Sequence, residues 1–162
     1  SIRKSHINAI QQTAFRGLMN LKYLDLEGNT LSLEHRKFKV TTFMYTPNLT
    51  HLYIAFNTVV MFSDWEARPN SETRAPLEQP RYQDYIDIFQ FLPNLTSLSI
   101  DTFRDMYLGY EFTNFTQLKR LKLYCAPVRE VYNNSFIGLA GLPLKDLELT
   151  YFSVLVPPTI HP

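Results

Sequence analysis

The sequence has little cysteine, little glycine and no long apolar run. A single cysteine, Cys125, has no partner within the chain for a disulfide, and five glycines are too few for glycine-rich loops that bind phosphate groups. No apolar stretch reaches the roughly 18 residues that span a bilayer, and the first residues, SIRKSHINAI, lack the apolar segment of a secretory signal. A membrane anchor would therefore have to lie in a segment absent here.

The sequence also lacks an excess of either charge and lacks the common catalytic motifs. Sixteen lysines and arginines nearly balance 15 acidic residues, which argues against a broad electrostatic grip on nucleic acid or on an anionic membrane. There is no Walker-type loop, H-E-x-x-H, C-x-x-C or G-x-S-x-G, and the four histidines lie far apart in the sequence. We therefore predict no catalytic, cofactor-binding or metal-binding residues, and we do not expect an enzyme.

What the sequence does have is an internal repeat. The pattern L-x-x-L-x-L begins at five positions, namely Leu21, Leu49, Leu95, Leu118 and Leu144. Two longer stretches, which contain TAFRGL and NSFIGL, also align with each other, so we expect the chain to open inside a repeat whose own strand is missing. Repeats at this period indicate a stacked architecture in which no single unit can bury its apolar face alone. We predict one domain over residues 1–162 with about six coils.

The pattern resembles the leucine-rich repeat family, in particular the extracellular subtype with an A-F-x-G-L ending, to which TAFRGL corresponds. That resemblance implies an α/β fold, a horseshoe-shaped solenoid with a short parallel sheet on its concave face and irregular or helical convex segments. The family's asparagine ladder is represented by Asn29 and Asn57. Other residues stand at the remaining ladder positions: Ser5, Phe103, Ala126 and Phe152.

One repeat is much longer than the others. The interval from Leu49 to Leu95 indicates an insertion at about 58–92, with a polar, proline-rich middle and helical spacing of apolar residues over 82–92. No end caps are visible, so we expect a fragment on which other segments of an ectodomain stack at both open ends.

Four N-glycosylation sequons favour a secretory route, at Asn48, Asn94, Asn114 and Asn133. The Pro-Asn-Leu-Thr sequences also fit a repeat that places threonine at the start of a strand. Cys125 is consistent with a half-buried thiol or with a disulfide to a cysteine outside the chain.

Alternation along each strand predicts which side chains line the concave face. They are Tyr23, Asp25 and Glu27; His51, Tyr53 and Ala55; Ser97, Ser99 and Asp101; Arg120, Lys122 and Tyr124; and Asp146, Glu148 and Thr150. We expect the carboxylates among them to be solvated. The best candidates for contacting a partner are Tyr23, His51, Tyr53, Arg120, Lys122 and Tyr124, because tyrosine and arginine are frequent interface anchors. Trp65, in the insertion, is a competing candidate.

Irregular repeat length, the insertion, the broken ladder and the sequons together resemble the ectodomain of a Toll-like receptor. That resemblance implies a glycoprotein of innate immunity that binds a protein or microbial ligand and signals by receptor dimerisation. It places the chain on the extracellular side of the membrane or in the endosomal lumen. The alternative is a leucine-rich adhesion, matrix or neuronal guidance protein without an immune role.

Overall fold

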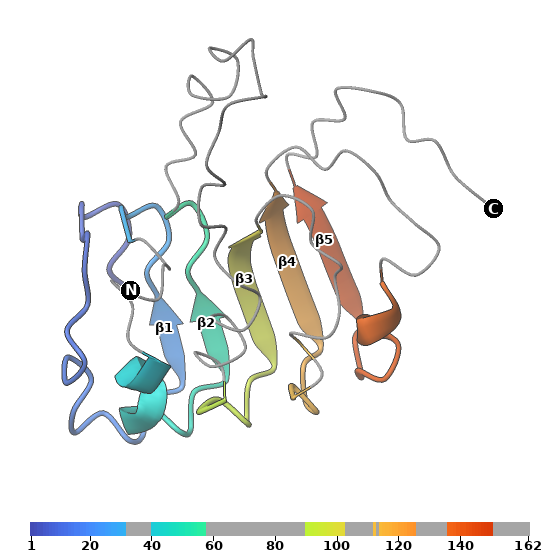
Figure 1. The fold of residues 1–162 in the computed structure, drawn as a ribbon, viewed down its shortest axis with the longest axis horizontal. Coiled ribbons are helices and arrows are strands. Elements are labelled where there is room, and N and C mark those ends of the chain that lie inside the picture. Colours follow the sequence, from blue (N-terminus) through green and yellow to red (C-terminus); the bar gives the residue numbers. More distant parts are fainter. Residues whose placement is uncertain (32–39, 58–89, 103–111, 113, 126–135, 151–162) are drawn as a thin grey trace, which may run out of the picture.

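The fold is a single parallel sheet whose five strands follow one another in sequence order (Figure 1). The computed structural model describes residues 1–31, 40–57, 90–102, 112, 114–125 and 136–150. The strands are β1 (Tyr23–Asp25), β2 (His51–Tyr53), β3 (Ser97–Thr102), β4 (Arg120–Cys125) and β5 (Asp146–Thr150). Each strand pairs with the next in parallel, so every connection must return to the same edge of the sheet before the next strand starts.

The repeat spacing determines the register between strands. Equivalent leucines lie opposite one another, so that Leu24 pairs with Leu52, Leu52 with Leu98 and Leu98 with Leu121. Because alternate side chains of a strand point to opposite faces, all of these leucines lie on one face. They are at most 6% exposed and belong to one continuous core. The predicted parallel sheet of stacked leucine-rich coils is confirmed, whereas the horseshoe curvature stays a prediction.

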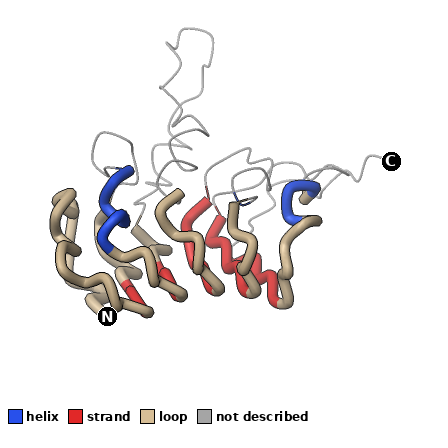
Figure 2. Tube along the Cα trace, turned by 90° about the horizontal axis from the view of Figure 1, so that it is seen from below, coloured by secondary structure: helices blue, strands red, loops and turns tan. Residues whose placement is uncertain are grey.

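In the described residues, short helices lie in two of the returning segments, on the side away from the strands (Figure 2). They are the 3₁₀ helices η1 (Val40–Tyr45) and η4 (Ile137–Leu139). Phe15 and Phe43 stack between neighbouring coils with ring centroids 6.1 Å apart and only 10° between the ring planes. Burial of such rings beneath the returning segment closes the core opposite the sheet.

The asparagine ladder exists where the sequence retains it. Asn29 Oδ1 accepts hydrogen bonds from the backbone N–H groups of Ser5 and Ile7, and its Nδ2 donates to the carbonyls of Ile2 and Leu26. Asn57 is equally buried and repeats this arrangement one coil further on. Each amide therefore satisfies backbone groups of two adjacent coils that would otherwise be buried without partners.

Several sequence predictions fall outside the described residues. These are Phe103, Ala126 and Phe152 at ladder positions, nearly all of the insertion with Trp65 and its helix, and the sequon at Asn133.

Candidate binding surface on the open face of the sheet

The face of the sheet opposite the leucines carries the side chains that the alternation predicted. We call it the open face, and it comprises Tyr23, Asp25, Glu27, His51, Tyr53, Ala55, Ser97, Ser99, Asp101, Arg120, Lys122, Tyr124, Asp146, Glu148 and Thr150. These residues differ widely in exposure. Tyr23 is 49% exposed, whereas Ser99 and Ala55 are fully buried. The open face is therefore not a uniformly solvated lining.

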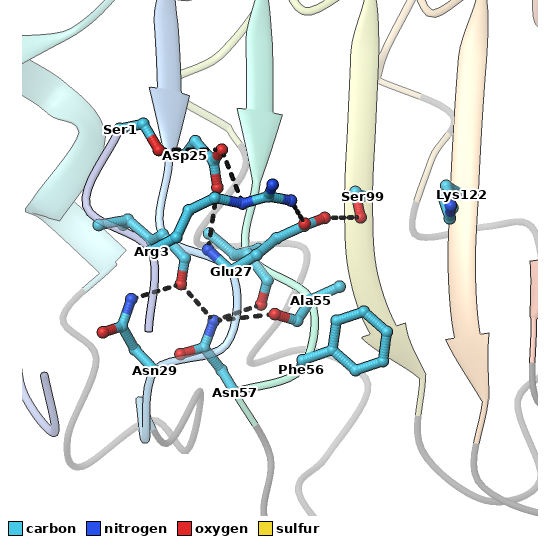
Figure 3. Close-up of polar contacts among 12 residues, drawn as sticks. Ser1, Arg3, Asp25, Glu27, Asn29, Ala55, Phe56, Asn57, Ser99 and Lys122 are labelled. Atoms are coloured by element: carbon cyan, nitrogen blue, oxygen red, sulfur yellow. Dashed lines mark hydrogen bonds and ion pairs between the residues drawn. The ribbon is translucent and has the colours of Figure 1, made fainter. Parts of the chain in front are cut away.

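Two carboxylates expected to be solvated are in fact buried. Asp25 is 3% exposed and Glu27 is 8% exposed. Arg3, from the segment before β1, places its guanidinium between them, with its Nε 3.0 Å from Asp25 Oδ2 and its NH2 group bonded to Glu27 (Figure 3). Ser99 of β3 donates to Glu27 Oε1 at 2.7 Å.

The physical reason for this correction is the length of the side chains involved. The Glu27 side chain extends across the short strand β2 to Ser99 on β3. The Arg3 side chain extends to Glu27 from the preceding coil. A buried carboxylate is stabilised only when it is paired and hydrogen-bonded, and here both conditions hold. The hydrogen bond to Glu27 also raises the pKa of Arg3. Asp25 and Glu27 are thus held by contacts between coils and are not solvated as predicted.

Asp101 also differs from its expected role. Its carboxylate accepts hydrogen bonds from the backbone N–H groups of Phe56 and Asn57, at 2.7 and 2.8 Å. Phe56 has a positive φ of 58°, a conformation that side chains rarely adopt. The carboxylate therefore holds a strained turn at the end of β2, and the Phe56 side chain remains 45% exposed.

Three rings form a compact group on β1 and β2. Tyr23 lies 6.0 Å from His51 and 5.3 Å from Tyr53, measured between ring centroids, and His51 lies 6.4 Å from Tyr53. Thr50 Oγ1 is 2.9 Å from His51 Nδ1, and the Tyr53 hydroxyl is 3.2 Å from Ser97 Oγ. We call Tyr23, His51 and Tyr53 the aromatic cluster. Three of the predicted partner-binding residues are thus brought together.

The electrostatic environment of the aromatic cluster is negative at Tyr23. Desolvation raises the pKa of the Tyr23 hydroxyl, and the charge of Asp25 raises it further. Arg3 acts in the opposite direction but does not cancel these effects. In the parallel register Asp25 lies directly opposite Tyr53, which places this carboxylate beside the cluster.

The other predicted candidates are on β4, where each basic residue has an acidic partner on β5. Arg120 Nε lies 2.9 Å from Asp146 Oδ2, and Lys122 Nζ lies 2.7 Å from Glu148 Oε1, between strand neighbours in register. The hydrogen bond between them lowers the pKa of Glu148 and raises that of Lys122. The basic side chains of β4 are therefore paired with the acidic side chains of β5.

The sequence analysis did not identify one exposed ring, Phe56, which contacts Tyr124 of β4. Phe56 packs on Tyr124 with ring centroids 3.9 Å apart, and Lys122 Nζ lies 5.0 Å from the centroid of Tyr124. Phe56 falls outside the strand alternation, at a turn whose geometry depends on Asp101, far away in sequence. No local pattern signals its position.

The sequon asparagines differ in their contacts. Asn48 Nδ2 donates to the carbonyl of Met19 at 2.9 Å, and Asn94 Nδ2 donates to the carbonyl of Pro47 at 3.0 Å. Asn114 is exposed. Glycosylation at these positions stays a prediction, as does the state of the Cys125 thiol.

Within the described ranges, no group of three or more histidine, cysteine, aspartate or glutamate side chains is arranged to hold a metal ion. The same part of the chain contains no helix with the length and apolarity to cross a membrane.

Comparisons with known proteins agree with this architecture. Residues 1–59 match the family model described as leucine rich repeat. Toll-like receptor 3 from Bos taurus is 28% identical over 170 residues, and Toll-like receptor 3 from Boselaphus tragocamelus is 27% identical over 172 residues. Each alignment covers 93% of this chain, and the chain spans 18% of each of those proteins.

Residues 1–59 carry the leucine rich repeat pattern, and the parallel strands stacked in the described residues have the arrangement of the class of leucine-rich repeat proteins. Within that class, the chain is distantly similar to Toll-like receptor 3 over most of its length.

Proposed function

We propose that the chain is a ligand-binding extracellular segment of a Toll-like pattern-recognition receptor, in which ligand binding leads to receptor dimerisation. The observation that carries the proposal is the aromatic cluster on the open face, in a chain whose similarity to Toll-like receptor 3 extends over nearly all of its length. Rings held on a rigid sheet give a partner contact area at a low cost in side-chain entropy.

The pairing of charges on the open face favours ligand binding at the aromatic cluster over ligand binding at β4. The charges of Arg120 and Lys122 are already paired with β5, so a ligand that used them would first have to break those ion pairs. The cluster has an exposed tyrosine, and around it the acidic side chains are fixed by hydrogen bonds. Preorganised side chains of this kind lose little freedom when a partner binds.

The test uses the complete protein that contains this chain, expressed in cells that carry a reporter for innate immune signalling. Cells are exposed to fractionated microbial extracts and to extracts of damaged host cells. We expect a response in the wild type and a clear loss of response when Tyr23 and Tyr53 are both replaced by alanine. The control is Tyr45→Ala, a tyrosine in η1 on the far side of the coil, with cell-surface amounts measured for each variant.

Absence of any response, together with adhesion of the expressing cells to matrix or to other cells, would favour the adhesion or guidance alternative. A response unchanged by the double replacement would leave the receptor role in place and move the ligand site away from the aromatic cluster.

A further inference from the structure

We propose that the aromatic cluster binds the guanidinium or ammonium group of a basic segment in a protein partner. This inference rests on the proposed function and names the chemistry of the partner.

The geometry of the rings suits a bound cation. Tyr23 and Tyr53 are the closest pair of the cluster, with centroids 5.3 Å apart and 51° between their planes. Tyr23 is half exposed and Tyr53 is partly exposed, so ring surface remains open to the solvent. A cation within about 6 Å of a ring centroid is attracted by the electron-rich face of that ring. Two neighbouring rings at an angle offer this attraction from two directions.

The charge around the rings also favours a cation. Asp25 and Glu27 lie beside the cluster, and a single arginine, Arg3, lies between them. One positive charge against two negative charges leaves a net negative charge, and the raised pKa of the Tyr23 hydroxyl has the same origin in part. An incoming cation is favoured there, and an incoming anion is disfavoured.

The same sheet supplies an internal precedent for this kind of contact. Lys122 Nζ lies 5.0 Å from the centroid of Tyr124, and the carboxylate of Glu148 lies 2.7 Å from that amine. A cation between a tyrosine ring and a carboxylate is therefore already present two strands away. On β1 and β2 the tyrosines and the carboxylates are in place, and the only basic side chain paired with those carboxylates in the described residues is Arg3.

The experiment measures binding of short peptides to the intact protein by fluorescence anisotropy. The probe is a fluorescein-labelled tetra-arginine peptide, blocked at both ends, at low ionic strength. The matched probes are a tetra-citrulline peptide, which has nearly the same shape without the charge, and a tetra-glutamate peptide. We expect binding of the arginine peptide to exceed binding of both others.

The variants separate the rings from general charge attraction. Tyr23→Leu and Tyr53→Leu should each weaken arginine-peptide binding by roughly two- to fivefold, and Tyr23→Phe should retain it, because cation–π attraction needs the ring and not the hydroxyl. Tyr124→Leu is the matched control on the same face and should have little effect on peptide binding, because Lys122 Nζ already lies over the Tyr124 ring.

An independent measurement uses the wild type alone. Ring currents should shift the NMR signals of the arginine side-chain protons upfield when the peptide binds. Equal binding of the arginine and citrulline peptides, stronger binding of the glutamate peptide, unchanged affinity in both leucine variants, or the absence of ring-current shifts would each overturn the proposal. A protein that responds to ligand in the reporter cells but shows any of these results would leave the proposed function standing and remove only this site.

Discussion

Single asparagine side chains bear a large share of the polar contacts between coils. Asn57 Nδ2 donates to the carbonyls of Leu26, Ile54 and Ala55, and its Oδ1 accepts from the N–H of Leu31 at 3.2 Å. Asn57 is 2% exposed, so water cannot replace these contacts. Asn57→Ala should therefore lower the free energy of unfolding by about 2–4 kcal/mol, because several backbone groups lose their partner. Urea denaturation measures the change.

The control for Asn57→Ala is Gln117→Ala, since Gln117 is an exposed amide in the segment before β4. Its replacement should change the free energy of unfolding by no more than about 0.5 kcal/mol. Equal losses in the two variants would show that the ladder hydrogen bonds contribute little.

The pair of Lys122 and Glu148 predicts a pH dependence at the residue scale. The hydrogen bond from Lys122 lowers the pKa of Glu148 below its ordinary value of 4.5, so the pair stabilises the fold above that pH and the contribution disappears as the pH falls through the lowered pKa. The raised pKa of Lys122 sets the upper limit of the pH range in which the pair stabilises the fold. That contribution is present below the ordinary value of 10.5 and disappears as the pH rises through the raised pKa.

An NMR titration of the Glu148 carboxyl carbon tests this prediction. In the wild type the midpoint should lie below 4.5, and in Lys122→Met it should move upward. The shift should shrink in high salt because the pair is exposed and screened. Arg120→Met is the matched control and should move the Glu148 midpoint far less. A midpoint insensitive to Lys122→Met would mean that the ion pair does not form in solution.

At the scale of the strand, equivalent leucines differ in burial from coil to coil. Leu121 and Leu123 of β4 are at most 1% exposed, whereas Leu147 and Leu149 of β5 are 42% and 37% exposed. Replacing Leu121 or Leu123 with alanine should destabilise the fold by about 2–5 kcal/mol, through lost burial and the cavity that remains. Leu149→Ala removes the same atoms from a partly exposed site and should cost less.

Chemical denaturation of the three single variants measures these differences. A cost below about 1 kcal/mol at both Leu121 and Leu123 would contradict the register in which they fill the core between coils.

The strands could be predicted from sequence because their signal is local and repeated. The L-x-x-L-x-L spacing located the five strands of the described residues, and alternation gave the correct face for Leu98 and Leu121. Exposure on the open face could not be predicted in the same way. It depends on contacts between distant positions, such as Ser99 with Glu27 and Asp101 with Phe56, which have no sequence periodicity. Alternation placed Tyr23 and Tyr53 on one face, but the contact between their rings follows only from the register.

For the whole molecule, the stacked architecture predicts a gradient of local stability. In repeat proteins each unit contacts mainly its neighbours, so local opening is easiest where a neighbour is missing or loosely packed. β3 and β4 each pair with a strand on both sides, over six residues with one another, three between β3 and β2, and five between β4 and β5, and their leucines are at most 1% exposed. Amide hydrogens of Leu98 and Leu121 should therefore exchange with solvent more slowly than those of Leu147 and Leu149.

Hydrogen exchange followed by NMR measures this gradient, and Glu27→Gln provides a test of its cause. Glu27 is bonded to Arg3, in the segment before β1, and to Ser99 of β3, so its side chain connects these two parts of the chain across β2. Removing the charge of Glu27 should speed exchange in β1, β2 and β3 while leaving β5 nearly unchanged, because β5 has no contact with that network in the described residues. Faster exchange everywhere by the same factor would instead indicate that the coils open as one cooperative unit.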